Sequence, residues 1–220
     1  MGVSIEGLFN IFISGLWVTL VVSTGGFILT VVIGVIGGST LVWGGPVIRP
    51  VMRIYVEIFR GTSIFFQLFF IYFVLPTAGI YLPPLIAGML ALGLNSGAYL
   101  SETVRGSILA VPREQTEAAV ALNLTLLQRI RTVILPQAIV IALPPLGNTA
   151  IEILKGSSLV SLIALNDLTF NAVMIRSHIG SSVGPLLALL LVYYLLSKTI
   201  DFGFRTIEAR LARGLDVLRA

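Results

Sequence analysis

The sequence contains 220 residues, of which 56% are hydrophobic and only 11% are charged. A soluble domain carries about 25% charged residues, so this composition excludes an ordinary soluble protein and indicates several membrane spans. The formal net charge is +4, and nothing in its distribution indicates nucleic-acid binding. The absence of cysteine excludes disulfides and thiolate metal sites. We predict an all-α membrane protein, a single domain of residues 1–220 with about five transmembrane helices.

The first predicted span is the almost unbroken apolar run of residues 8–36. It exceeds the ~20 residues needed to cross a bilayer and lacks the basic front end of a signal peptide, so we expect a retained helix. Four glycines in it would let a neighbouring helix approach closely: Gly15, Gly25, Gly26 and Gly34. Residues 39–50 are rich in Gly and Pro and predict a turn.

The second predicted span, residues 51–75, carries a polar stripe. Glu57 and Arg60 are spaced i, i+3, so they can pair on one helix face, and Gln67 continues the stripe. One interpretation is an ion pair with polar side chains that hold helices together. The other is part of a solute path, and the sequence leaves both open.

The third predicted span, residues 85–109, carries a second stripe. Asn95, Tyr99 and Glu102 lie at i, i+4 and i+7, which places them on one helix face. Glu102 can also pair with Arg105, one turn further on. Because unpaired carboxylates are rare within membranes, we favour this structural pairing for Glu102.

The fourth predicted span, residues 137–155, contains Pro144 and Pro145, and we expect them to interrupt the helix. A broken backbone at membrane depth is tolerated where it lines a wet cavity. Three polar residues share one helix face just beyond the prolines: Asn148, Glu152 and Lys155. This combination predicts a solute cavity. The alternative is a Glu152–Lys155 ion pair that braces the helix end.

Residues 156–182 are too polar and too broken to span a membrane, and we interpret them as a mixed loop. The only histidine, His178, has no second ligand nearby and so indicates no metal site. The fifth span covers residues 183–200, and residues 204–219 predict an amphipathic helix with apolar residues on one face and arginines on the other. Such a helix is suited to lying on a membrane surface.

The distribution of basic residues predicts the orientation of the chain. Residues 1–48 contain no Lys or Arg. Of the 14 basic residues, only Lys155 and Arg176 fall on segments that we assign to the outside. By the positive-inside rule, the N-terminus is external, and residues 111–136 and the C-terminus face the cytoplasm.

Residues 111–136 form the one long polar interruption, which reads VPREQTEAAVALNLTLLQRIRTVILP. Pro112 can open a first short helix. Asn123 ends it, because asparagine tolerates the left-handed conformation of a tight turn. Thr125 and Gln128 have the spacing of a capping box, which predicts the start of a second helix. The segment is therefore a folded loop.

This loop resembles the EAA loop of ABC-importer permeases. The matching residues are Glu117-Ala118-Ala119, a turn residue four positions later, and Val133-x-Leu135-Pro136. In that family, a short coupling helix in this loop docks into a groove on a cytoplasmic ATPase. The family has Gly where this chain has Asn123 and usually Ile where it has Val133, but Asn can hold the turn and Val keeps the apolar contact. The resemblance implies a set of ATPase-coupling residues: Glu117, Ala118, Ala119, Asn123 and Arg129.

Four further segments resemble the polar amino-acid subfamily of these permeases, the histidine, glutamine and arginine type: YVEIFRGTS, GAYLSETVRGSI, LPPLGN and LKGSSLVSLIALNDL. The subfamily usually has Pro where this chain has Ser63, and it often has Asp where this chain has Gly156. The second difference removes one contact to a cationic substrate. The candidate substrate path consists of seven residues: Glu57, Gln67, Asn95, Tyr99, Asn148, Glu152 and Lys155.

The resemblance implies a permease subunit of an ATP-driven importer for polar amino acids or related zwitterionic solutes such as ectoine. The implied assembly has two permease subunits, identical or related, two cytoplasmic ATPases and an external solute-binding protein, and it lies in a bacterial inner membrane. ATP and Mg²⁺ would bind the ATPase, so we expect no cofactor on this chain. The chain should not be an enzyme, because neither Lys155 nor Lys198 follows a glycine as a P-loop requires.

The alternative function is a non-transporting membrane scaffold or channel subunit. A channel would need a repeated polar or charged filter, and the sequence contains none that we can identify. A scaffold would leave the polar stripes of the spans without a purpose.

Overall fold

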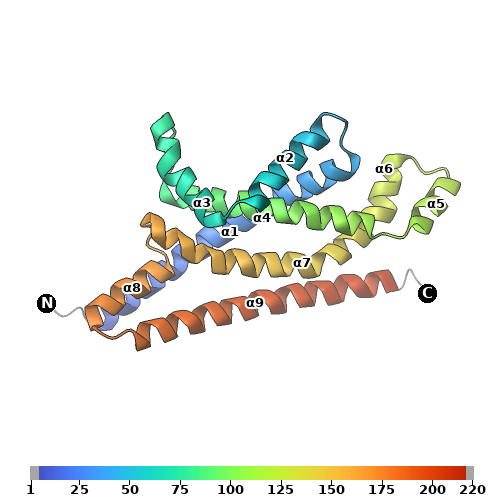
Figure 1. Ribbon diagram of the computed structural model, residues 1–220. Helices are drawn as coiled ribbons and strands as arrows, with labels where there is room; N and C mark the ends of the chain where they lie inside the picture. The colour runs from blue at the N-terminus through green and yellow to red at the C-terminus, as the bar shows by residue number, and fades with distance from the viewer. Residues whose placement is uncertain (1–4, 217–220) are drawn as a thin grey trace.

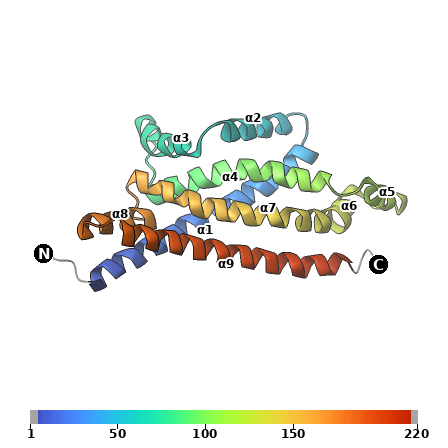
Figure 2. The same cartoon turned by 60° about the horizontal axis from the view of Figure 1, so that its bottom comes forward.

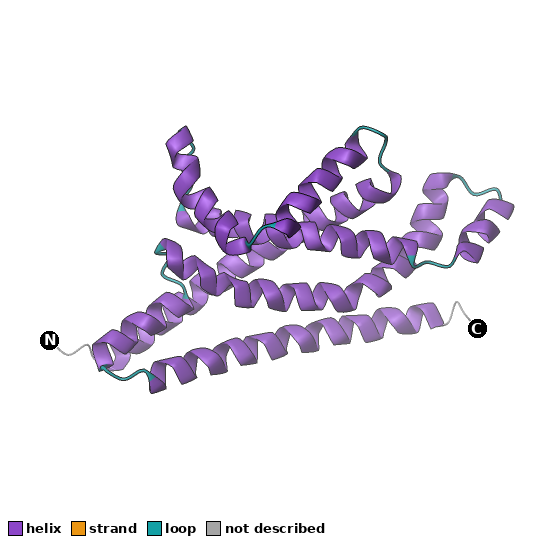
Figure 3. Ribbon diagram, in the orientation of Figure 1, coloured by secondary structure: helices purple, strands orange, loops and turns teal. Residues whose placement is uncertain are grey.

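The computed structural model describes residues 5–216, and these form helices joined by short loops, with no strand in that range (Figures 1 and 3). The long helices are α1 (Ile5–Trp43), α4 (Pro84–Leu109), α7 (Leu135–Gly156) and α9 (Val183–Asp216). The shorter ones are α2 (Ile48–Gly61), α3 (Ile64–Phe69), α5 (Arg113–Ala121), α6 (Leu126–Arg129) and α8 (Leu168–Ile179). The predicted all-α class is confirmed.

Four helical segments are long and apolar enough to cross a membrane: Glu6–Trp43, Pro84–Leu109, Leu126–Ile163 and Val183–Leu211. A fifth candidate is a pair of helices, Ile48–Gly61 and Ile64–Ala78, that meet at 103°. The long helices run along the same axis of the molecule, with α8 at one end and α5 and α6 at the other (Figure 1). The expectation of about five spans therefore agrees with the structure.

The core forms where α1 packs closely along α4. A Cβ built on Gly34 would lie 2.5 Å from Leu100 Cγ, so only glycine lets α4 approach here. Gly15 is crowded in the same way by α8 and the turn before it, because its Cβ would lie 2.8 Å from the Asp167 carbonyl oxygen. Buried side chains from α1, α3, α4 and α7 complete an apolar cluster: Val22, Leu68, Ala91, Leu92 and Ile153.

The second span is broken rather than straight. Thr62 and Ser63 are extended, with ψ of 150° and 137°, and separate α2 from α3. The Ser63 hydroxyl accepts the Phe65 N–H at 3.3 Å, so it starts a new helix instead of continuing the old one. The predicted span of residues 51–75 is therefore not a single straight helix but contains α2 and α3, which meet at 103°. Beyond α3 the chain continues through the π-helical turn Phe70–Val74 and the 3₁₀ turn Leu75–Ala78.

The fourth span is continuous where we predicted a break. Pro144 and Pro145 lie inside α7, which runs from Leu135 to Gly156 without interruption. Two adjacent prolines remove only the N–H donors that would reach the carbonyls of Val140 and Ile141, and the flanking turns keep their own hydrogen bonds. The backbone break in this protein lies between α2 and α3 instead.

The segment predicted as a mixed loop, residues 156–182, is mostly helical. It contains the 3₁₀ segment Ser157–Ile163 and α8. Ala164 adopts a left-handed conformation with φ of 56°, which turns the chain between them. The Asp167 Oδ1 atom then accepts the Phe170 N–H at 2.9 Å and caps α8.

The last helix, α9, is a single element from Val183 to Asp216 that lies along α7 at the side of the molecule (Figure 2). The predicted division into a span ending at residue 200 and a separate surface helix from 204 is therefore wrong; residues 217–219 of that prediction lie outside the described residues. The Phe204 ring lies 6.1 Å from that of Phe27, near the middle of α1. Arg205, which we assigned to the cytoplasmic end, thus follows a residue that packs against the middle of α1.

Candidate functional site

The polar loop of residues 111–136 folds as two short helices around a tight turn, as predicted. Asn123 has a φ of 56°, in the left-handed region. Thr125 and Gln128 form both halves of a capping box at the start of α6. Pro112 lies one position before α5 rather than at its first position. After Arg129 the chain runs through the π-helical segment Ile130–Ile134 directly into α7.

The loop does not expose all of the residues that we assigned to ATPase docking. Glu117, Ala118 and Asn123 are exposed. Ala119 is only 3% exposed, and its carbonyl accepts the Leu124 N–H at 3.1 Å. Because α5 packs against the π-helical segment, Ala119 faces into the loop, and the prediction that it belongs to an exposed docking face is wrong.

Sequence reasoning missed a group of apolar side chains exposed on this loop: Val120, Leu122, Leu126 and Leu127. Leu122 and Leu127 are each 74% exposed, although they lie on a segment that is otherwise polar. Their apolar character within a polar loop was the signal that could have found them. Arg129 is half-buried, and its Nε atom is buried without a hydrogen-bond partner.

A polar cavity of about 390 Å³ lies between α2 and α4 and is lined by Glu57, Arg60 and Tyr99, among others. The Arg60 guanidinium lies 5.2 Å from the centre of the Tyr99 ring, and the Tyr99 hydroxyl donates to the Arg60 carbonyl at 3.3 Å. The alternative Glu57–Arg60 ion pair does not form. The predicted Glu102–Arg105 pair does form, at 2.7 Å.

Gln67 and Asn95 both bind the carbonyl of Phe59, from Nε2 at 2.9 Å and from Nδ2 at 3.0 Å respectively. This carbonyl lies in the last turn of α2, where the bend removes its helical donor. Gln67 also donates to the Thr62 hydroxyl at 2.7 Å. Two residues of the candidate path therefore hold the break between α2 and α3, a role that the sequence did not indicate.

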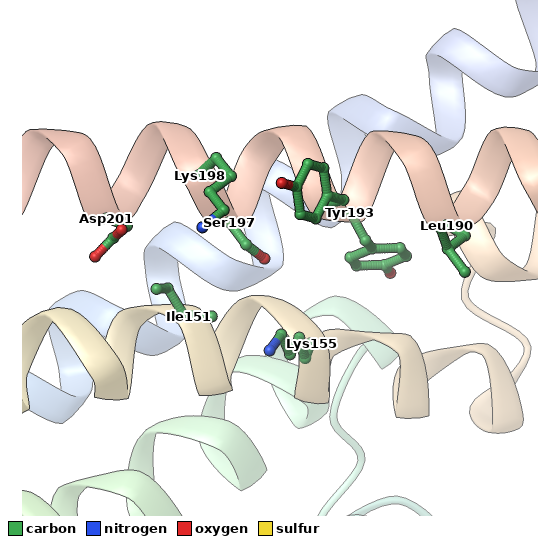
Figure 4. Close-up of a pocket in the computed structure, with 8 residues that line it drawn as sticks. Ile151, Lys155, Leu190, Tyr193, Ser197, Lys198 and Asp201 are labelled. Atoms are coloured by element: carbon green, nitrogen blue, oxygen red, sulfur yellow. The ribbon is translucent and has the colours of Figure 1, made fainter.

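The three polar residues of α7, Asn148, Glu152 and Lys155, are all exposed. Among the side chains of residues 6–211, the only ion pairs are Glu102–Arg105 and Asp201–Arg205, so the alternative Glu152–Lys155 pair does not form. Lys155 lines a second cavity, of about 480 Å³, between α7 and α9 (Figure 4). Asn148 and Glu152 line neither of these two cavities.

The structure thus divides the candidate substrate path into separate groups. Glu57 and Tyr99 share one cavity, and Gln67 and Asn95 share one carbonyl beside it. Lys155 opens on another cavity with residues of α9 that were not predicted. No group of three His, Asp or Glu side chains in the described part of the chain could hold a metal ion.

Comparison with known proteins shows which family the chain resembles. Residues 30–213 match the family described as “Binding-protein-dependent transport system inner membrane component”. A probable amino-acid ABC transporter permease of Sinorhizobium fredii is 41% identical over 205 residues, which cover 90% of this chain and 86% of the relative. The glutamine transport system permease protein GlnP of Escherichia coli is 34% identical over 198 residues, or 89% of each chain.

A solved structure shares both fold and sequence with this chain. A chain from an amino acid ABC transporter with histidines superposes with a TM-score of 0.85 at 35% identity, covering 96% of this chain and 100% of its own length. The long apolar helices agree with the multi-pass inner-membrane character of these relatives. The chain therefore belongs to the inner-membrane component family of binding-protein-dependent transport systems, and it is a permease subunit of an ABC transporter rather than an enzyme.

Proposed function

We propose that this permease imports polar amino acids or related zwitterionic solutes. The relatives named for glutamine and the structural neighbour that holds histidines support this substrate class. Glu152 and Lys155 on α7 also support it, because they are exposed, opposite in charge and not paired with each other. A zwitterion brings one group of each charge and could engage both.

The exposed apolar side chains of the loop carry the proposal that this chain couples to an ATPase. A cluster of exposed leucines on a loop outside the membrane marks a protein-docking surface, because a partner that covers these apolar side chains removes them from water. We define the loop face as Glu117, Ala118, Val120, Leu122, Asn123, Leu126 and Leu127. The partner is a cytoplasmic ATPase with a groove that receives the short helices. Arg129, whose Nε atom has no acceptor, would donate to that partner.

The proposed assembly contains two permease subunits, two ATPases and an external solute-binding protein, with ATP and Mg²⁺ held by the ATPases. The N-terminus faces outwards. Arg205 no longer supports this orientation, since it follows Phe204, which packs against the middle of α1. Five arginines near the ends of α1, α2 and α4 and within the loop still do: Arg49, Arg53, Arg105, Arg113 and Arg129.

The experiment is to reconstitute the permease with its ATPase and binding protein in liposomes. We expect ATP-dependent uptake of labelled L-glutamine, L-histidine or ectoine. Leu127→Asp should abolish uptake and ATPase co-purification, because it places a carboxylate in an apolar interface. The matched control is Val47→Asp, which changes an equally exposed apolar residue outside the loop and should retain both. Absence of ATP-driven uptake of all three solutes by the wild-type assembly, or normal ATPase co-purification with Leu127→Asp, would contradict the proposal.

A further inference from the structure

The cavity between α7 and α9 is lined by more ionisable and hydroxyl groups than the sequence predicted. Figure 4 shows Lys155 of α7 facing the side of α9 that carries Tyr193, Ser197 and Lys198. Asp201, one turn further along α9, also lines it. Its volume of about 480 Å³ falls within the range typical of sites for small molecules.

The charges around this cavity do not balance. Asp201 Oδ1 already accepts the Arg205 Nε–H at 2.9 Å, so Arg205 neutralises this carboxylate. Neither Lys155 nor Lys198 has an ion-pair partner among the side chains of residues 6–211. The Lys198 ammonium lies 5.8 Å from the centre of the Tyr194 ring, which stabilises a cation but supplies no anion. Two positive charges thus face one cavity without a counter-charge.

One more polar atom at the cavity lacks a partner. The Ser197 Oγ atom is buried and makes no hydrogen bond to any described residue. A buried hydroxyl without a partner is unfavourable, so a ligand that accepts a hydrogen bond from it would be stabilised here. Two lysines and one hydroxyl are all donors, and together they fit the two oxygens of a carboxylate.

All residues that line the cavity belong to two candidate membrane spans, Leu126–Ile163 and Val183–Leu211. Phe204, one turn from Asp201, packs against Phe27 near the middle of α1 and against Gly147 near the middle of α7. The Asp201 end of the cavity is therefore level with the middles of α1 and α7, whereas Lys155 lies in the last turn of α7. Ionisable residues at this depth are expensive and usually mark a substrate path.

We propose that the α7–α9 cavity binds the carboxylate of the transported solute through Lys155, Lys198 and Ser197. The inference rests on the proposed import of amino acids or zwitterions, and it adds two α9 residues to the path. The tyrosines form the wall on the α9 side.

A cysteine-protection experiment tests this cavity directly, because the native chain has no cysteine. Leu190→Cys places a thiol in the cavity wall, and Leu187→Cys places one on α9 outside the lining residues. In the assembled transporter, saturating L-glutamine or L-histidine should slow thiol labelling at residue 190 about tenfold and leave residue 187 unchanged. The corresponding amino-acid amides, which lack the carboxylate, should not protect.

Removing a lysine then separates binding from folding. Lys198→Met in the Leu190→Cys background should abolish protection without changing the labelling rate in the absence of solute, and Lys198→Arg should restore it. The KM for uptake should rise tenfold to a hundredfold, since a charge-assisted hydrogen bond contributes about 1.5–3 kcal/mol.

Two outcomes would overturn the inference while the proposed function stands. One is wild-type uptake with no protection of residue 190 by either amino acid. The other is protection that depends on phosphatidylglycerol in the membrane and not on the solute. If the wild-type assembly takes up none of the three solutes, L-glutamine, L-histidine and ectoine, it is the proposed function that fails.

Discussion

Asp167 is an acidic side chain with no exposed surface, in the turn between two spans. Its Oδ1 atom caps α8, but Oδ2 is buried without a hydrogen-bond partner. Burial raises the pKa of this carboxyl from its ordinary value of 3.8 to about 6, although the Phe170 N–H acts in the opposite direction. The folded protein therefore binds this proton more tightly than the unfolded chain does.

This shift predicts a pH-dependent stability. Because the folded pKa exceeds the unfolded one, the contribution of Asp167 is fully present below pH 3.8 and is lost as pH rises to about 6. The loss amounts to about 3 kcal/mol at most. Asp167→Asn keeps an N-cap acceptor but removes the charge, so it should raise the melting temperature at neutral pH and flatten the pH profile. Thermal unfolding of the purified protein across this range checks it; a lower melting temperature for the variant at every pH would contradict it.

For single residues, the sequence predicted the features that depend on adjacent positions in the chain. It did not predict the hydrogen bonds that depend on residues far apart in the sequence. The left-handed Asn123, the Thr125–Gln128 capping box and the Glu102–Arg105 pair each depend on a few adjacent positions. The role of Gln67 and Asn95 depends on the Phe59 carbonyl, which only the folded chain brings to them. No spacing rule connects residues 59 and 95.

At the scale of helices, the sequence indicated the spans but misplaced the break. Prolines suggested a break in α7, yet a helix tolerates two adjacent missing donors when both flanking turns are packed. The real break follows Gly61 in α2, where there is no proline. It persists because side chains of α3 and α4 satisfy the carbonyls that the bend leaves free, which is a tertiary effect.

The close packing of α1 predicts opposite outcomes for two glycine substitutions. Gly15→Ala would bring a Cβ to 2.8 Å from the Asp167 carbonyl oxygen, a backbone atom that cannot move aside, and should destabilise by about 1–3 kcal/mol. Gly106 of α4 has nothing within 4 Å of an added Cβ. Gly106→Ala should be neutral or stabilise by about 0.5–1 kcal/mol. Melting temperatures of the two variants in detergent measure the difference, and equal effects would show that α1 does not pack as described.

For the whole molecule, composition and basic-residue distribution predicted a multi-span bundle, while the positions of its cavities could not be predicted. One cavity lies between α2 and α4 and the other between α7 and α9. The second is lined by α9 residues that lie mostly within the predicted fifth span, but the sequence did not indicate that this span packs along α7. Periodicity within one helix does not reveal which neighbour its polar face will meet.

The orientation can be tested with single cysteines in the cysteine-free chain. The residues at the extreme ends, such as Gly2 and Ala220, lie outside the described residues, so Glu6 and Gly45 are better positions. Glu6 is exposed at the start of α1, and Gly45 is open between α1 and α2. Glu6→Cys should react with an impermeant maleimide on intact cells, and Gly45→Cys should react only after permeabilisation. The reverse pattern would show that the N-terminus is cytoplasmic.

The continuity of α6 with α7 has a mechanical consequence. Residues Leu126–Ile163 form one helical segment of 38 residues, so Leu126 and Leu127 of the loop belong to the same continuous helix as Lys155. At 1.5 Å per residue, Leu127 and Lys155 are separated by ~42 Å along it. A rotation of the helix that is imposed at the loop would therefore also rotate the α7 residues that line the cavity. Between Leu127 and Lys155, the regular helix is interrupted by the π-helical segment Ile130–Ile134 and by the pair Pro144–Pro145. The stiffness of these two points would set how much of the rotation is transmitted to the cavity.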